Sequence, residues 1–230
     1  MESPHSQDQD ARRRDAVIVA LRDAYREALL LGVASVAERV VGEAIDAGLS
    51  ELAIDEEILT PAMRVVGDLW AAGEISIADE HLATSISFRI IALQHERFRV
   101  AASRASKRVL LAAVEGERHI LGLEMAANAL MHAGYDVRML GADVPLHEIG
   151  PAVARHKPAV LGLTMSRPSA AAAAHAAIAA ARDASPAVGV LLGGTCATDV
   201  RSGAPGVAVC THVSDVLELT DALAQGASMN

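Results

Sequence analysis

The hydrophobic pattern changes once along the chain, near residue 107, and that change limits the folds the chain can adopt. From Asp15 to Arg99, apolar residues recur at the spacing of one helix face, with breaks at Gly32, near Gly48 and at Gly73. The pattern predicts four amphipathic helices. Helices of this kind, joined by short connections, favour a four-helix bundle.

After Lys107, short apolar runs alternate with helical segments. Alternating strands and helices predict a parallel sheet with helices on both faces. The expected fold class is therefore α/β: an N-terminal four-helix bundle that acts as a cap, followed by a Rossmann-like, flavodoxin-like domain with a five-stranded parallel sheet. We predict strands at 108–114, 135–141, 159–165, 187–194 and 206–210, and helices at 120–133, 146–156, 169–184, 196–202 and 213–224.

These patterns divide the chain into five segments. We expect a disordered tail at 1–14, the helical bundle at 15–99, a linker at 100–107, the α/β domain at 108–225 and a short tail at 226–230.

Composition argues against several classes of protein. The formal net charge is −9, and phosphate neutralisation needs clustered Lys and Arg, so we expect no direct binding to DNA. Cys196 and Cys210 have no CxxC spacing and are interpreted as reduced thiols of a cytoplasmic protein. No apolar run reaches the roughly 18 to 20 residues that a membrane span needs, so no membrane association is expected.

One histidine follows the first predicted strand, at the sheet edge where ligands bind in folds of this class. Glu117, His119 and Gly122 form the pattern E-x-H-x-x-G. A neutral imidazole is a good metal ligand, and a carboxylate often orients its other ring nitrogen. A solvated turn histidine before a helix has the same spacing. The spacing alone does not separate a metal ligand from a surface residue.

This pattern resembles the D-x-H-x-x-G signature of cobalamin-binding domains found in methionine synthase, corrinoid methyl carriers and mutases, with Glu in place of Asp at 117. The resemblance implies that His119 is the lower cobalt ligand and displaces the cofactor's own dimethylbenzimidazole base into a slot beside the sheet. The matching slot positions are Thr164, Ser166, Gly193 and Gly194. Short side chains there would let a planar base approach the backbone. Considered one at a time, each of these residues is also compatible with the end of an ordinary strand.

A second pattern lies in the helical half, where Trp70 is followed after nine residues by Glu80 and His81. This W-x9-E-H pattern resembles the light-sensing, adenosylcobalamin-dependent transcriptional regulators. The resemblance implies that Trp70 and Glu80 hold the adenosyl group and that His81 becomes the upper cobalt ligand after light. Without the resemblance, we would interpret Trp70 as a core side chain that packs between helices, and Glu80 and His81 as surface residues.

Two functional classes follow. The favoured one is a non-catalytic light sensor that binds adenosylcobalamin and changes conformation or assembly, including homo-oligomer formation, to regulate a protein partner such as a transcriptional regulator. The 14 residues before the bundle leave no room for the DNA-binding domain usual in that family. The alternative is a corrinoid methyl carrier of a methyltransferase system, which would need an open upper face. Trp70 and a competing His81 would obstruct that face. Methyl and hydroxo forms of cobalamin would use the same lower site as the favoured adenosyl form. A third possibility is cobalamin storage or delivery, in which substituting Trp70 would have little effect on the protein's role.

Overall fold

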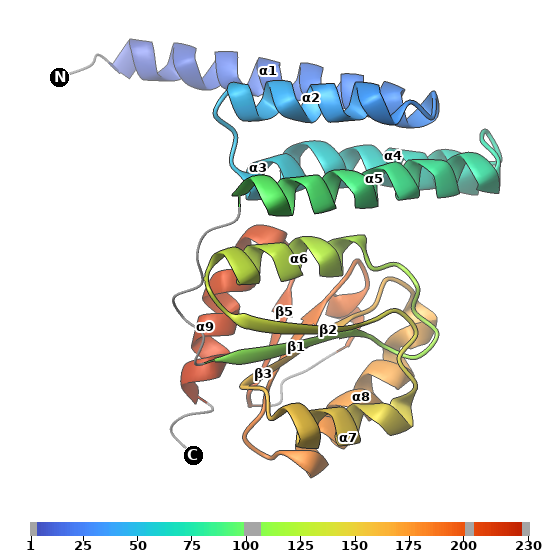
Figure 1. Ribbon diagram of the computed structural model, residues 1–230, viewed down its shortest axis with the longest axis vertical. Helices are drawn as coiled ribbons and strands as arrows, with labels where there is room; N and C mark the ends of the chain where they lie inside the picture. Colours follow the sequence, from blue (N-terminus) through green and yellow to red (C-terminus); the bar gives the residue numbers. More distant parts are fainter. Residues whose placement is uncertain (1–3, 99–106, 201–204, 227–230) are drawn as a thin grey trace. The chain divides into compact units, whose positions relative to one another are not determined.

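The computed structural model describes residues 4–98, 107–200 and 205–226 (Figure 1). Internal contacts divide the chain into two compact units, Met1–Arg97 and Phe98–Asn230. The expected linker at 100–107 and the expected tail at 226–230 lie outside the described residues except for their inner ends, Lys107 and Gly226.

The first unit consists of helices, as predicted. Its elements are α1 (Pro4–Leu30), α2 (Ala34–Asp46), α3 (Glu51–Ile54), the π-helical turn η1 (Asp55–Leu59), α4 (Thr60–Ala71) and α5 (Ile77–Phe98). Because α3, η1 and α4 follow one another without a gap, these elements form four rods, and the predicted bundle is confirmed. Pro61 is the second residue of α4 and has no N–H to donate, and because α4 continues η1 without a gap, it lies inside this rod next to the π turn.

The start of α1 corrects one expectation. The helix begins at Pro4, whereas residues 1–14 were expected to form a disordered tail. The segment from Pro4 to Arg14 contains two Gln, one Ala and three Arg, which are good helix formers, and proline suits a first helical position. Extending a helix that already exists also avoids a second nucleation cost. Polarity therefore did not indicate disorder here.

The bundle core is largely apolar, and two hydrogen bonds within it join buried polar side chains. Tyr25 on α1, which is fully buried, shares a hydrogen bond of 3.1 Å with Ser87 Oγ on α5. Gln94 Nε2 on α5 donates to Asp55 Oδ1 in the π turn at 3.0 Å. Burial raises the pKa of Asp55 to about 7, with Gln94 opposing the rise and Glu51 and Glu56 adding to it. The surrounding core includes Leu29, Val40, Ile54, Ile58, Leu59, Val66 and Ile90.

The second unit is a parallel sheet between two layers of helices. The strands are β1 (Arg108–Ala113), β2 (Asp136–Gly141), β3 (Val160–Thr164), β4 (Gly189–Gly193) and β5 (Val207–Cys210), in the order β2-β1-β3-β4-β5. This is the flavodoxin-like order, so the predicted fold is confirmed. Helices α6 (Leu121–His132) and α9 (Val216–Gly226) cover one face, and α7 (Leu146–His156) and α8 (Ala171–Ala184) cover the other (Figure 1).

One predicted helix of this unit is wrong. The described part of the predicted helix 196–202, residues 196–200, forms only a short 3-10 turn, Ala197–Asp199, and residues 201–202 lie outside the described residues. Thr198 and Asp199 form helices poorly because their side chains compete for backbone groups, and Val200 already has extended backbone angles.

Within the described ranges, no helix is both long enough and apolar enough to cross a membrane.

Candidate functional site

The loop between β1 and α6 carries Glu117 and His119 at the carboxyl edge of the sheet. Gly116 has a φ of +81°, which favours glycine, and its N–H donates to Asp143 Oδ1 at 2.6 Å. The N–H of Asp143 donates in return to the Glu117 carbonyl at 2.8 Å. The loop after β1 is thus bonded in both directions to the loop after β2.

Glu117 is the buried centre of this loop, with no exposed surface. Its Oε1 accepts hydrogen bonds from the backbone N–H of His119 at 2.8 Å and from the ring Nδ1 of His119 at 2.6 Å. Its Oε2 accepts from the N–H of Ser166 at 2.6 Å. Burial alone would raise the pKa of Glu117, but the N–H groups of His119 and Ser166 and the His119 ring outweigh it and lower the pKa. The carboxylate is therefore charged at neutral pH.

His119 offers one ring nitrogen to a ligand. An ionised carboxylate can only accept hydrogen bonds, so Nδ1 carries a hydrogen, and in the neutral ring Nε2 then has the free lone pair. The His119 side chain is 66% exposed although its partner is fully buried. We call Glu117 and His119 the sheet pair. A carboxylate–histidine pair of this form is the usual arrangement around a protein-bound metal.

The predicted slot residues lie at the ends of β3 and β4. Thr164 is buried, and it stands opposite Gly193 in the strand register. Gly194 has a φ of +103°, and a Cβ there would lie 2.0 Å from the Met165 carbonyl oxygen, so only glycine fits. At Gly193 the nearest atom would be 3.9 Å away, which any small residue tolerates. The backbone at Gly194 therefore packs directly against the β3 end that supplies Ser166.

The remaining sheet residues have different surroundings. The Ser166 carbonyl accepts hydrogen bonds from Thr195 Oγ1 at 3.2 Å and from Cys196 Sγ at 3.4 Å. A Cβ at Gly122, in the first turn of α6, would meet no atom within 4 Å. Ser166 is thus held on both sides, whereas Gly122 borders open space.

The helical unit places Trp70, Glu80 and His81 around a single turn. Trp70 lies at the end of α4, and Glu80 and His81 lie in the first turns of α5, separated by a short connection. Ser76 starts α5 with a reciprocal cap: its N–H donates to Asp79 Oδ2 at 2.9 Å, and the Asp79 N–H donates to Ser76 Oγ at 3.2 Å. Trp70 is 46% exposed, which argues against the core-anchor reading.

Glu80 and His81 form a second pair, the bundle pair. Nδ1 of His81 lies 2.6 Å from Glu80 Oε2, and the Thr84 hydroxyl donates to Glu80 Oε1 at 2.8 Å. The His81 side chain is 72% exposed, and that of Glu80 is 18% exposed. The bundle pair thus leaves Nε2 of an exposed imidazole accessible, as the sheet pair does.

Sequence reasoning missed two residues that shape these pairs. Thr84 lies one helical turn after Glu80, and the i, i+4 spacing on a predicted helix was the signal that would have found it. Asp143 comes from a loop 27 residues away from Gly116, and no local pattern connects the two. Among residues 4–98, 107–200 and 205–226, no group of three or more His, Cys, Asp or Glu side chains is placed to hold a metal ion.

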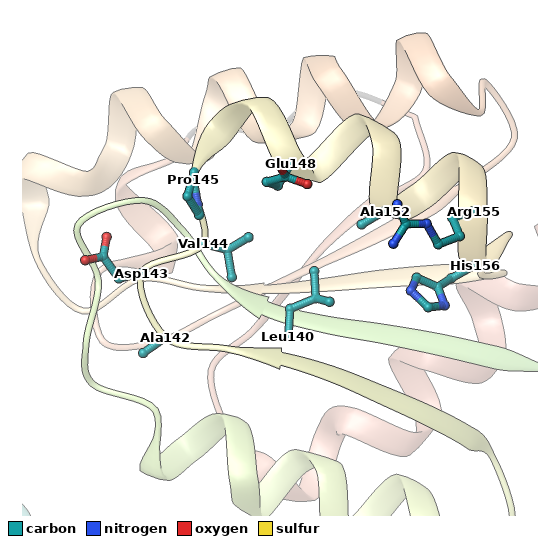
Figure 2. A pocket seen from close by; sticks show the side chains of 9 residues that line it. All are labelled: Leu140, Ala142, Asp143, Val144, Pro145, Glu148, Ala152, Arg155 and His156. Atoms are coloured by element: carbon teal, nitrogen blue, oxygen red, sulfur yellow. The ribbon is translucent and has the colours of Figure 1, made fainter.

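A pocket of about 280 Å³ lies beside the edge strand β2, under α7 (Figure 2). Asp143, which bonds Gly116, connects it to the loop of the sheet pair. None of the predicted site residues lines it. The lining residues are Leu140, Ala142, Asp143, Val144, Pro145, Glu148, Ala152, Arg155 and His156.

Comparison with known proteins gives one consistent result. Residues 21–93 and residues 107–219 each match a family model described as a B12 binding domain. The chain is 31% identical over 146 residues to the HTH-type transcriptional repressor CarH of Myxococcus xanthus, an alignment that covers 62% of this chain and 48% of the repressor. It is 30% identical over 130 residues to the trimethylamine corrinoid protein of Methanosarcina barkeri, covering 54% and 58% of the two chains.

A solved structure supports the fold. The monomethylamine corrinoid protein of Methanosarcina barkeri superposes with a TM-score of 0.75 at 18% identity, over 90% of this chain and 98% of that one. At this identity the likeness shows the fold alone. The chain spans about half the length of the curated relatives that it matches.

Proposed function

This chain is a cobalamin-binding protein of the B12-binding domain family, and we propose that it is a light sensor that uses adenosylcobalamin. One observation carries the proposal: an exposed tryptophan and a carboxylate-held imidazole lie around the same turn of the bundle. These residues, Trp70, Glu80 and His81, match the pattern of the light-sensing regulators.

The sheet pair fits the lower side of cobalamin. His119 supplies an exposed Nε2 with a free lone pair, and Glu117 fixes the tautomer and the ring orientation. At the slot positions, the absence of a side chain at Gly193 leaves backbone at the end of β4 open to a flat ring. The absence of a side chain at Gly194 lets the backbone of Met165 pack against it, which brings the segments after β3 and β4 together. Gly122, facing open space, adds no bulk beside His119. We therefore assign His119 as the lower cobalt ligand, with Thr164, Ser166, Gly193 and Gly194 along the base slot.

The bundle residues fit the upper side. Bound adenosylcobalamin supplies a cobalt–carbon bond that light breaks. Trp70 presents a large exposed apolar ring, which suits stacking near an adenine. The Glu80 carboxylate uses only part of its acceptor capacity on His81 and Thr84, so it can also accept hydrogen bonds from ribose hydroxyls. His81 offers Nε2 as the upper ligand once the adenosyl group has left.

These roles define a switch between two ligand-biased states. In the dark state, Trp70 and Glu80 would hold the adenosyl group. In the light state, His81 would take the place of that group. We propose that the change alters the assembly of the protein, including homo-oligomer formation, and its contact with a protein partner that regulates transcription. The likeness to a transcriptional repressor supports that output. The chain acts in this role without catalysing a reaction.

The second candidate is a methyl carrier. It is favoured by the likeness to the trimethylamine corrinoid protein, which the chain matches at 30% identity. The lower side would be the same in this role. A carrier needs an upper face open to a methyl donor. The exposed Trp70 near the end of α4 and the available His81 nitrogen near the start of α5 argue against such a face.

An absorption experiment separates the two candidates. Purified protein is mixed with adenosylcobalamin or methylcobalamin in the dark and then illuminated with green light. The sensor predicts a stable bis-imidazole cobalt spectrum after illumination of the adenosyl form, and a change in elution on gel filtration. His81→Ala should bind adenosylcobalamin in the dark but lose that light product. His147→Ala is the matched control, because His147 is also exposed and belongs to neither pair.

Each outcome has a distinct meaning. Tight binding of methylcobalamin without a light product from the adenosyl form would favour the methyl carrier. An unchanged light spectrum in His81→Ala would show that His81 is not the upper ligand.

A further inference from the structure

The two glutamates that orient histidines are held by different means. Glu117 is fully buried, and two backbone N–H groups and an imidazole bond its carboxylate. Glu80 lies on the side of a helix and is partly exposed. The structure gives its carboxylate two contacts, the His81 ring on Oε2 and the Thr84 hydroxyl on Oε1. If the Thr84 contact were removed, the carboxylate would keep only its hydrogen bond with the His81 ring, which is the group that the carboxylate has to orient.

The orientation of His81 matters because an imidazole has two possible ligand atoms. A neutral ring carries its hydrogen on either nitrogen, and the hydrogen bond made by one nitrogen decides which is left as the ligand. Glu80 Oε2, 2.6 Å from Nδ1, selects the form with hydrogen on Nδ1 and a free lone pair on Nε2. Oε2 stays beside Nδ1 only while the carboxylate does not rotate.

We propose that Thr84 is a positioning residue of the bundle pair: its hydroxyl holds Glu80 so that His81 presents Nε2 to an upper ligand site. The inference rests on the proposed function, because it concerns how His81 reaches cobalt. Thr84 lies one turn after Glu80 on the same helix, so its hydroxyl fixes Oε1 from a rigid backbone and is itself half-buried. Thr84 does not touch the cofactor in this role. It acts through Glu80.

The variants are chosen to separate the hydroxyl from the packing. Thr84→Val keeps the branched shape and removes the hydroxyl, and Thr84→Ala removes both the hydroxyl and the methyl group. Thr84→Ser restores a hydroxyl without the methyl group. A positioning role predicts that Val and Ala behave alike and that Ser restores the parent behaviour. A purely structural role predicts that Val is the mildest change. Using both Val and Ala keeps the test valid if one of them folds poorly.

The first readout needs no cofactor. Nitrogen NMR of the His81 ring, in the chain of residues 1–230 at about pH 8 where an ordinary imidazole is neutral, reports which nitrogen carries the hydrogen. We expect Nδ1–H in the parent and in Thr84→Ser, and a mixture of both forms in Thr84→Val and Thr84→Ala. The His119 ring serves as an internal control and should not change, because its partner Glu117 lies in the other unit. An unchanged His81 ring in both Val and Ala would overturn the proposal.

The second readout uses the adenosylcobalamin complex. After a light flash, the rate at which the bis-imidazole spectrum appears should fall about tenfold in Thr84→Val and recover in Thr84→Ser, since losing such an outer partner typically costs 10- to 100-fold. Equal rates in parent and Thr84→Val would also overturn the proposal. If the parent itself gives no light product, the proposed sensor fails, and the NMR result still decides whether Thr84 positions His81.

Discussion

The two units each present a histidine whose Nδ1 lies 2.6 Å from a glutamate, yet the two pairs differ in their surroundings. In the sheet pair, the glutamate is sealed in the protein and bonded by N–H groups from two separate loops. In the bundle pair, the glutamate lies on one helix and is held by its neighbours on that helix. The sheet pair suits a ligand that stays on the metal in every state. The bundle pair suits one that binds only when a site is vacated.

The largest expected effect is a difference between the two histidines in the dark binding of adenosylcobalamin. His119→Ala should weaken dark binding of adenosylcobalamin by more than about 100-fold, because losing a ligand costs more than losing its outer partner. His81→Ala should leave dark binding within about threefold of the parent, since that residue is assigned to the light state only. Titration followed by absorption measures both. Equal losses in the two variants would mean that the two pairs do not have different roles.

A second variant tests the rigidity of the sheet edge. Gly194→Ala places a Cβ 2.0 Å from the Met165 carbonyl oxygen at a positive φ, so it should destabilise the second unit by about 3 kcal/mol and weaken the Ser166 contact to Glu117. Gly193→Ala is the matched control, with an expected loss below about 1 kcal/mol. Urea unfolding followed by circular dichroism gives both values. Similar stabilities for the two variants would contradict the close approach at Gly194.

A third prediction concerns pH, to which Asp55 in the first unit and Glu117 in the second respond with opposite sign. The pKa of Asp55 is raised to about 7, so its contribution to stability is full below the unfolded value, about 3.9, and is lost as the pH rises through 7. The pKa of Glu117 is lowered, so its contribution is present above the unfolded value and is lost as the pH falls through the folded one.

Asp55→Asn keeps an acceptor for Gln94 and removes the charge. At about pH 8 it should stabilise the bundle by about 2 kcal/mol, with almost no effect near pH 4. The chain has one tryptophan, Trp70, so its fluorescence during urea unfolding reports on the bundle. Asp46→Asn, at an exposed position, is the control. A parent whose bundle stability does not change between pH 4 and 8 would rule out a titrating Asp55.

The smallest expected effect concerns the helix end that carries the bundle pair. Ser76→Ala removes the side-chain oxygen that caps α5 and should cost about 1 kcal/mol of bundle stability. Ser85→Ala, at an exposed position further along α5, should cost less than about 0.5 kcal/mol. Tryptophan fluorescence serves again as the measurement. A larger loss at Ser85 would indicate that the cap does not define the start of α5.

Periodicity predicted the bundle and the sheet because both depend on which side of each element is apolar. The five strands begin and end within two residues of the predicted ranges. Local motifs also indicated Glu117 with His119 and Glu80 with His81, because each pair is close in sequence. The bond from Ser166 to Glu117 spans 49 positions, and the support from Asp143 comes from another loop. Such contacts depend on how strand ends meet, which no local spacing encodes.

The π turn Asp55–Leu59 also affects the direction in which the side chains of α4 point, because α4 continues the same rod. A π turn accommodates one residue more than an α turn, and one residue corresponds to a rotation of about 100° about the helix axis. All of α4 is therefore out of phase with α3. Deleting a single residue here would convert the π turn to an α turn and rotate Trp70 by about 100° about the helix axis. The side chain of Trp70 would remain intact but would point in a different direction.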